Sequence, residues 1–207
     1  FVYSQYAVIA MRNNKRFAKI EFAEDGNTIE IDMYKKGELY RSNYYDDRGF
    51  ISRTCIYSNE KPVYEEYLRP DGVWKLRVFL TDGHVEINPE CNTYLMGENQ
   101  RSKHIPFART YYENLGQVVC EVTENYIKQT NLSDVFCVAV HKLHFKMLCD
   151  LLKNRKLILS FFGKRYVFVR EKEELTLVKN ANYIITDSQD TSLELEKYVS
   201  KKIKNIK

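Results

Sequence analysis

The chain of 207 residues is long enough for one large domain or two small ones, with a sizeable buried core. Its 44% hydrophobic and 29% charged residues are typical of a globular protein, and no apolar run approaches the roughly 20 residues that a membrane-spanning helix needs. A net charge of +4 is too small to indicate nucleic-acid binding without a concentrated basic patch.

The cysteines indicate a reducing compartment. They number five, an odd count, and none are spaced as CxxC, which argues against both a zinc site and a disulfide framework. Because the sequence starts at Phe1 inside a strand-like pattern and shows no signal peptide, we expect a piece of a longer, cytoplasmic protein. The cysteines are Cys55, Cys91, Cys120, Cys137 and Cys149.

Turn signals recur regularly through the first half of the chain. Five of them end in glycine, which reaches the positive φ angles of tight hairpin turns without a steric penalty. With a further turn at Asn59, successive turns lie about 11 or 12 residues apart. This period predicts consecutive antiparallel hairpins, about eight strands ending near Asn88, and it excludes βαβ units, whose crossovers are longer. The glycines are Gly26, Gly37, Gly49, Gly72 and Gly83.

The strands of this predicted meander differ in the composition of their faces. Asn27–Tyr34 alternates apolar with mainly acidic residues, as a half-buried strand does. Glu38–Tyr45, Phe50–Tyr57 and Pro62–Leu68 instead mix tyrosine or charged residues with apolar ones on both faces, which does not suit a sandwich with a dry core. We therefore expect residues 1–95 to form an extended antiparallel β-meander that protrudes as a single layer and docks another molecule. The alternative for any one side chain is that its cross-strand pair only stabilises the sheet.

The second half alternates helices and strands after a polar stretch, Glu90–His104, that we interpret as a connector. Short, continuously apolar strands separated by helices indicate a parallel sheet. The sequence thus predicts an α+β chain in which residues 104–207 form a partial Rossmann-like α/β domain. Its expected elements are a helix from Pro106 to about Gln129, strand Val135–Val140, helix Lys142–Lys153, strand Lys156–Phe162, an ambiguous segment Val167–Val178, strand Asn182–Ser188 and a basic closing helix Ser192–Ile206.

Three short motifs of this half suggest chemistry, and each has a plainer explanation. FFGKR (Phe161–Arg165) offers backbone amides and two cations to a phosphate, but its lone glycine also fits an ordinary turn. His141 and His144 supply two metal ligands without a nearby third, which favours a solvated helix end. Asp187 ends a strand where carboxylates often reach a site, although we favour a role as N-cap of the last helix. No dinucleotide motif, P-loop or catalytic set is found, so we predict neither a metal nor a cofactor.

Motifs of the first half carry a resemblance to a known family. DDRGFIS (Asp46–Ser52), DGVWKLR (Asp71–Arg77) and VEINP (Val85–Pro89) resemble the glycosyltransferase-like protein of the bacterial accessory Sec system, which exports serine-rich-repeat glycoprotein adhesins in Gram-positive bacteria. The resemblance runs most clearly from Ser4 to Pro89. It implies a GT-B-like architecture of two Rossmann domains, of which this chain holds an inserted meander and part of the first domain.

The resemblance also implies a non-catalytic component, cytoplasmic or at the inner face of the cell membrane, that acts with other accessory Sec proteins and the motor ATPase on the serine-rich glycoprotein, and not with nucleic acid. The sheet then binds a partner protein or carbohydrate, with aromatic rings stacking on sugars and arginines donating hydrogen bonds. The alternative is the acceptor-binding half of an active protein O-glycosyltransferase. A surface or toxin-associated meander is a weaker third, because the free cysteines argue against secretion. The candidate binding residues are Tyr40, Arg41, Tyr44, Arg53, Tyr57, Tyr64, Trp74 and Arg77.

Overall fold

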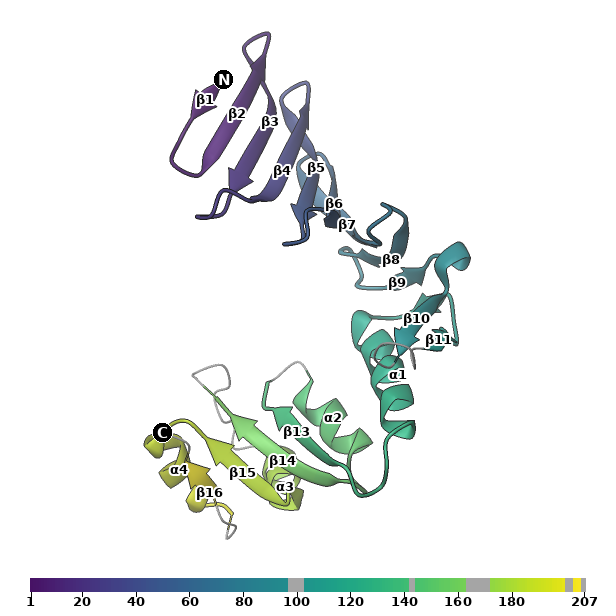
Figure 1. Ribbon diagram of the computed structural model, residues 1–207, viewed down its shortest axis with the longest axis vertical. Helices are drawn as coiled ribbons and strands as arrows, with labels where there is room; N and C mark the ends of the chain where they lie inside the picture. The colour runs from purple at the N-terminus through teal and green to yellow at the C-terminus, as the bar shows by residue number, and fades with distance from the viewer. Residues whose placement is uncertain (97–102, 142–143, 163–171, 200–202, 206–207) are drawn as a thin grey trace. The chain divides into compact units, whose positions relative to one another are not determined.

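The computed structural model describes residues 1–96, 103–141, 144–162, 172–199 and 203–205 (Figure 1). Contacts within the chain divide it into two compact units, Phe1–Val118 and Val119–Lys207. Each unit contains a sheet of its own, antiparallel in the first and parallel in the second.

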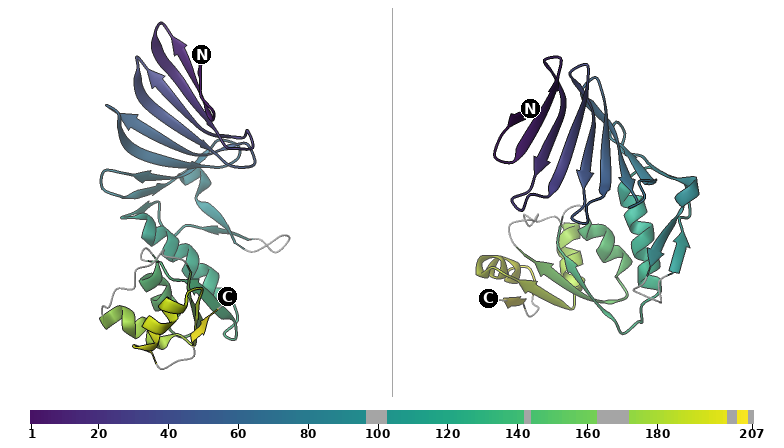
Figure 2. Two further views of the ribbon diagram at one scale, coloured as in Figure 1. Left: turned by 90° about the vertical axis from the view of Figure 1, so that its left-hand side faces the viewer. Right: turned by 45° about the horizontal axis from the view of Figure 1, so that its top comes forward.

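The first unit is built on an antiparallel sheet of ten strands, nine of which are consecutive in both sequence and space. Figure 2 shows these strands side by side in one twisted layer, which confirms the predicted meander. A late strand, β12, completes the sheet by pairing with β9. The strands are β1 (Val2–Tyr3), β2 (Ala7–Arg12), β3 (Lys15–Phe22), β4 (Thr28–Lys35), β5 (Glu38–Tyr45), β6 (Ile51–Ser58), β7 (Lys61–Leu68), β8 (Trp74–Phe79), β9 (Val85–Ile87) and β12 (Tyr111–Tyr112).

The hairpins close as the turn signals predict. Gly26 and Gly49 have φ angles of 86° and 83°, and Asn59 reaches 50° in the turn that lacks a glycine. Each hairpin from β2–β3 to β7–β8 also contains a register shift close to its turn. Such β-bulges increase the local twist of a sheet and re-aim the side chains near the turn.

The stretch expected to be a connector contains a second, two-stranded sheet. A 3-10 turn, η1 (Pro89–Cys91), leads into β10 (Thr93–Met96), which pairs antiparallel with β11 (Lys103–Pro106). The prediction of a polar connector is therefore wrong, and so is a helix that starts at Pro106. Pro106 is the last residue of β11. Proline is tolerated at the end of a two-stranded sheet, where the N–H group that it lacks is not required to pair with a further strand.

The first long helix, α1 (Leu115–Lys128), begins later than predicted. The side-chain oxygen of Asn114 accepts a hydrogen bond from the backbone N–H of Gln117 at 3.1 Å, which satisfies one of the free donors of the first turn. The Gln117 side chain in turn accepts from the backbone N–H of Glu113 at 3.2 Å. Asn114 is therefore the residue that sets the start of this helix.

The second unit contains a parallel sheet with strand order β13-β14-β15-β16. Its first three strands confirm the sequence prediction, and their continuous apolar character suits a sheet with a buried face. The elements are β13 (Val135–Ala139), α2 (Phe145–Leu151), β14 (Lys156–Phe161), α3 (Lys172–Asn180), β15 (Tyr183–Thr186), α4 (Gln189–Glu196) and β16 (Ile203–Asn205).

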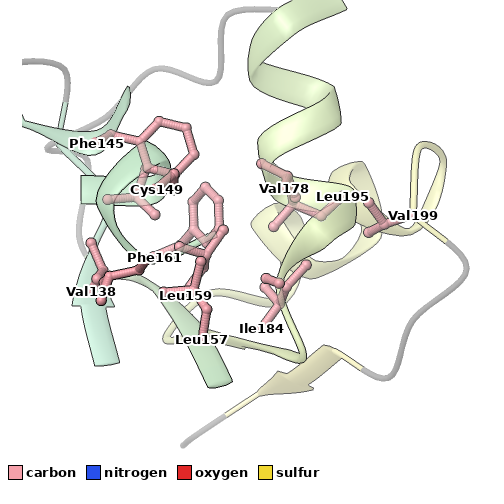
Figure 3. Close-up of a cluster of buried hydrophobic side chains, with 13 residues drawn as sticks. Val138, Phe145, Cys149, Leu157, Leu159, Phe161, Val178, Ile184, Leu195 and Val199 are labelled. Carbon is pink, nitrogen blue, oxygen red and sulfur yellow. The ribbon is translucent and has the colours of Figure 1, made fainter. Parts of the chain in front are cut away.

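One face of this parallel sheet forms the core of the second unit (Figure 3). Val138, Leu159 and Ile184 are neighbours across three strands, and side chains from α2, α3 and α4 pack against them. The opposite face is open at its ends, since Val135 and Tyr183 are 54% and 60% exposed. The α/β character of residues 119–207 is thus confirmed in its coarse form.

The C-terminal segment differs from the predicted closing helix. Helix α4 ends at Glu196, and the basic stretch that follows places Ile203–Asn205 in strand β16, parallel to β15. Leu193 is 53% exposed, whereas Leu195 is buried. The prediction failed because parallel pairing joins residues distant in sequence and leaves no local signal.

Helix α4 is also capped differently than expected. The Ser188 hydroxyl accepts from the backbone N–H of Thr191 at 3.5 Å, so Ser188, and not Asp187, is the N-cap. The ambiguous segment Val167–Val178 is helical where it is described, from Lys172 onward in α3, and its earlier residues lie outside the described part.

Candidate interaction surface

Strand pairing assigns the side chains of the ten-stranded sheet to two faces, because directly opposite residues of an antiparallel pair share a face. We call one of them face 1. Two rows of paired residues define it across the sheet: Val8, Ile20, Ile31, Asn43, Thr54, Glu66 and Arg77, and beside them Ala10, Ala18, Met33, Arg41, Ile56, Tyr64 and Phe79.

The opposite side of the same strands is face 2. Its two rows contain more charged side chains than those of face 1. They are Ile9, Lys19, Asp32, Ser42, Cys55, Glu65, Val78 and Val85, and beside them Ala7, Glu21, Glu30, Tyr44, Arg53, Tyr67, Leu76 and Ile87.

The apolar side of the sheet changes from one face to the other along its width. On β2–β4 the two rows of face 1 are apolar, while those of face 2 carry Lys19, Glu21, Glu30 and Asp32. On β8 and β9 face 2 is the apolar side, and it is buried at β9. Val85, Ile87 and Tyr112 there are at most 1% exposed, and the Tyr112 ring contacts Phe107, which packs on Tyr94.

Arg77 is the centre of a charged and aromatic cluster on face 1. Its Nη2 donates to Glu66 at 2.7 Å and its Nη1 to Glu86 at 3.4 Å. The guanidinium also lies 4.5 Å from the ring centroid of Trp74 and 4.8 Å from that of Tyr64. Planar stacking combined with paired carboxylates neutralises the charge, so this cluster stabilises the sheet by itself.

Four rings continue from this cluster toward β12. The centroids of Tyr64 and Phe79 lie 5.6 Å apart, those of Phe79 and His84 4.0 Å, and those of His84 and Tyr111 5.3 Å. Asp82 pairs with His84 at 2.6 Å, and this hydrogen bond lowers the pKa of the Asp82 carboxyl. Phe79, His84 and Tyr111 were not among the predicted binding residues. Their aromatic character, at the end of the meander on β8, just before β9 and on β12, was the available signal.

Arg53 forms the matching cluster on face 2. Its Nη1 donates to Glu65 at 2.7 Å, and its guanidinium lies 3.9 Å from the ring centroid of Tyr44. Tyr67 donates to the other oxygen of Glu65 at 3.3 Å. Burial raises the pKa of Tyr44, and the nearby carboxylate of Glu30 adds to the increase. The Arg53 charge is therefore paired within the sheet, as is that of Arg77.

Tyr57 belongs to the same face. Burial raises the pKa of its hydroxyl, which has hydrogen-bond contacts with Ser42 and Cys55. Cys55 is itself buried, and that burial raises the pKa of its thiol. These groups form a polar cluster on face 2 at β5 and β6, where Ser42 and Cys55 are buried.

Arg41 has a different environment, on face 1 at the middle of the sheet. Its Nε donates to Asn43 at 2.7 Å and its Nη2 to Thr54 at 3.4 Å, and the Thr54 hydroxyl donates to Asn43 at 3.1 Å. Asn43 and Thr54 are 6% and 0% exposed. Tyr40 lies beside this network, where its hydroxyl approaches the sulfur of Met33 at 3.8 Å.

The eight predicted binding residues thus do not form one site. Arg41, Tyr64, Trp74 and Arg77 lie on face 1, and the Tyr40 hydroxyl reaches the same side. Tyr44, Arg53 and Tyr57 lie on face 2. The carboxylates that neutralise two of the arginines were missed by the sequence analysis; they are Glu65, Glu66 and Glu86.

The motifs of the second unit form no site among the described residues. The rings of His141 and His144 stack with centroids 5.4 Å apart, and no group of three metal-ligating side chains is found in the described part of the chain. Gly163–Arg165 of the FFGKR motif lie outside the described residues. Where the structure is described, none of its helices has both the length and the apolar character to cross a bilayer.

A family model for accessory secretory protein 1, a protein of the accessory Sec system, matches residues 1–207. The chain belongs to this family. Curated members from Streptococcus gordonii and Staphylococcus aureus, both described as this accessory Sec system protein, are 28% and 27% identical to it, each over 96% of the chain. The chain spans 36% and 37% of the lengths of these two relatives.

Solved structures with the same fold include complexes of this family. A chain of the Glycosylation Associate Protein (Gap123) complex from Streptococcus agalactiae matches all of this chain and 40% of its own length, with a TM-score of 0.85 and 27% identity. A chain of the structure of accessory secretory proteins 1, 2 and 3 from Streptococcus pneumoniae gives a TM-score of 0.76 at 27% identity, over 96% of this chain and 38% of its own.

The fold is shared with glycosyltransferases. A chain of a GtfA/B complex bound to UDP and GlcNAc matches 93% of this chain and 42% of its own, with a TM-score of 0.62 at 12% identity. The pneumococcal O-GlcNAc transferase GtfA, in complex with UDP and GlcNAc, gives 0.53 at 11% identity over 99% of this chain and 42% of its own.

Proposed function

We propose that this chain is the docking part of a non-catalytic component of the accessory Sec system. The observation that carries the proposal is the broad single-layer sheet. The two rows of its face 1 are apolar on β2–β4, while the ion pairs of β6–β8 stabilise the sheet without a ligand. An apolar face of this kind, with no element of its own unit described over it, suits contact with another protein. Membership of the accessory Sec family supports the setting.

The partners in this proposal are other accessory Sec proteins. Relatives at 27% identity belong to the structures of a Gap123 complex and of accessory secretory proteins 1, 2 and 3. We extend the proposal to the motor ATPase and to the serine-rich glycoprotein, with carbohydrate as a further ligand of the aromatic residues. The setting is the cytoplasm or the inner face of the membrane, without nucleic acid.

The architecture proposed for the longer protein is of the GT-B type. Residues 1–95 would be the extended meander and residues 104–207 part of a Rossmann-like domain, and the fold shared with O-GlcNAc transferase supports this division. The same likeness favours a second candidate, in which the chain is the acceptor-binding half of an active protein O-glycosyltransferase. We favour the non-catalytic function because the chain belongs to the accessory Sec family and is 27–28% identical to its members, against 11–12% for the glycosyltransferases.

The two candidates differ in one reaction. The full-length protein, given UDP-GlcNAc and a serine-rich polypeptide, should transfer no sugar, while an O-GlcNAc transferase in the same assay does. Mixed with accessory secretory proteins 2 and 3, the protein should elute with them as one stoichiometric species in size-exclusion chromatography. Sugar transfer would refute the non-catalytic role, and separate elution would refute docking.

A further inference from the structure

Arg41 differs from the two other arginines of the predicted surface in its lack of an acidic partner. Arg53 and Arg77 each have a carboxylate within 2.7 Å. Within the part of the chain that the structure describes, no carboxylate lies within ion-pair distance of Arg41, and its hydrogen bonds go to neutral Asn43 and Thr54. A half-buried guanidinium is stabilised most strongly by a carboxylate, which can accept two parallel hydrogen bonds.

The guanidinium of Arg41 is also held in place. Nε and Nη2 are fixed by two side chains that are almost fully buried and hydrogen-bonded to each other. The N–H groups of Nη1 can donate to a bound partner, since none of the described residues accepts a hydrogen bond from Nη1. An arginine fixed in this way loses little conformational entropy when it binds an acceptor.

The surroundings of Arg41 on face 1 are apolar. Met33 and Ile56 are its direct cross-strand neighbours, and Ile31 and Ile20 continue the adjacent row. These side chains are half-buried, although no described element of their own unit covers this side of the single layer. A fixed arginine at the border of an apolar area matches the composition of interface hot spots, which favour arginine at desolvated centres.

Resting on the proposed docking function, we propose that face 1 of β3–β6 binds a segment of a partner protein in which one Asp or Glu is flanked by apolar residues. The carboxylate of this segment accepts hydrogen bonds from Arg41, and its apolar neighbours cover Ile20, Ile31 and Met33.

The charges of face 1 favour this occupant over a phosphate, an anionic membrane or a second copy of the chain. A site for a phosphate or an anionic membrane usually contains several cations. In the two rows of face 1 on β2–β6, Arg41 is the one cationic residue. A second copy placed face to face would offer Glu66, which Arg77 already engages.

The first test compares charge removal on the two faces. Full-length Arg41→Gln should bind the accessory secretory protein 2 and 3 pair at least about tenfold more weakly than wild type in isothermal titration calorimetry. Lys19→Gln, which removes a half-buried charge from face 2, should bind within about twofold of wild type. Circular dichroism and the thermal midpoint confirm that both variants are folded. Equal affinities of Arg41→Gln and wild type would overturn the inference while leaving docking intact, whereas a wild type that does not bind would refute the proposed function itself.

A second variant remains informative if Arg41→Gln fails to fold. Arg41→Lys keeps the charge and introduces an amine that a carbodiimide can join to a carboxylate in direct contact. Mass spectrometry of the cross-linked complex should then identify an amide between the introduced amine and one Asp or Glu of the partner, within an apolar sequence. Arg53→Lys should couple within the chain, to Glu65. A cross-link from position 41 to a second copy of this protein, or none to the partner in a complex that forms, would refute the proposed occupant.

Discussion

Thr54→Val removes one hydroxyl from the network that fixes Arg41 and should destabilise the middle of the sheet. Thr54 is 0% exposed, donates to Asn43 at 3.1 Å and accepts from Arg41 at 3.4 Å. Valine has nearly the same shape, so the substitution leaves no large cavity but deprives two polar groups of a partner. Each such loss costs about 1 kcal/mol, and because the contact with Arg41 is long we expect a total of about 1–2 kcal/mol.

Native-state hydrogen exchange of the full-length protein measures this loss locally. A loss of about 1–2 kcal/mol accelerates exchange about 5- to 30-fold, and the affected amides should be those of β5 and β6. Thr28→Val is the matched control, because Thr28 is half-buried on β4 and its hydroxyl has no hydrogen-bond partner among the described residues. If exchange in β5 and β6 is equal in the two variants, the network does not stabilise the sheet and the argument for a pre-positioned Arg41 fails.

Three further predictions concern single groups. Burial raises the pKa of Cys149 to about 12, so at pH 8 iodoacetamide should modify Cys149 far more slowly than exposed Cys137, and equal rates in the folded protein would contradict this. Burial also raises the pKa of Glu30, so this carboxyl favours folding when protonated and disfavours it as the pH rises through its folded-state pKa. Glu30→Gln should therefore raise the thermal midpoint at pH 7 and less so near pH 4; a midpoint unchanged at pH 7 would refute this reasoning. Ser188→Ala should cost helix α4 about 1 kcal/mol in hydrogen exchange, and an equal effect of Asp187→Asn would contradict the assignment of the cap.

The hairpins of the first unit could be predicted because their determinants are local. A glycine at positive φ, as at Gly26 or Gly49, fixes both the turn and the antiparallel direction of its strands. The 11- or 12-residue period then gives the order of the strands, since each strand pairs with the next one in sequence. The apolar strands β13, β14 and β15 were predictable for a similar reason, because their continuous apolar runs are bounded by polar turns.

The elements that were missed depend on non-local pairing. β16 pairs with β15 across helix α4, and its sequence, Ile203–Asn205 within a lysine-rich stretch, fits an amphipathic helix equally well. β12 joins β9 through only two residue pairs, one of which buries Tyr112 against Val85. Short strands of this kind carry too few residues for a periodic pattern, so tertiary contacts decide them.

The division of the candidate residues between two faces could not be read from simple alternation. A bulge close to each turn shifts the register, so that Trp74 comes opposite Leu68 although Leu76 comes opposite Tyr67. Trp74 consequently lies beside Arg77 on face 1. The sequence indicated which residue types would line the sheet, while the bulges decide which of them meet.

The change of apolar side across the sheet explains how a single layer can be stable and still serve the proposed docking function. At β9 and β12 the apolar side chains of face 2 are buried, and Tyr112 contacts Phe107, which packs on Tyr94 of β10; these contacts anchor one end of the sheet. Near the middle, the Arg53–Glu65 pair and the hydrogen bonds among Arg41, Asn43 and Thr54 stabilise the sheet in place of an apolar core. On β2–β4 the apolar rows of face 1 are half-buried, and no described element of their own unit covers them. Because the stabilising contacts lie elsewhere, the docking that we propose would leave the sheet folded when the partner dissociates.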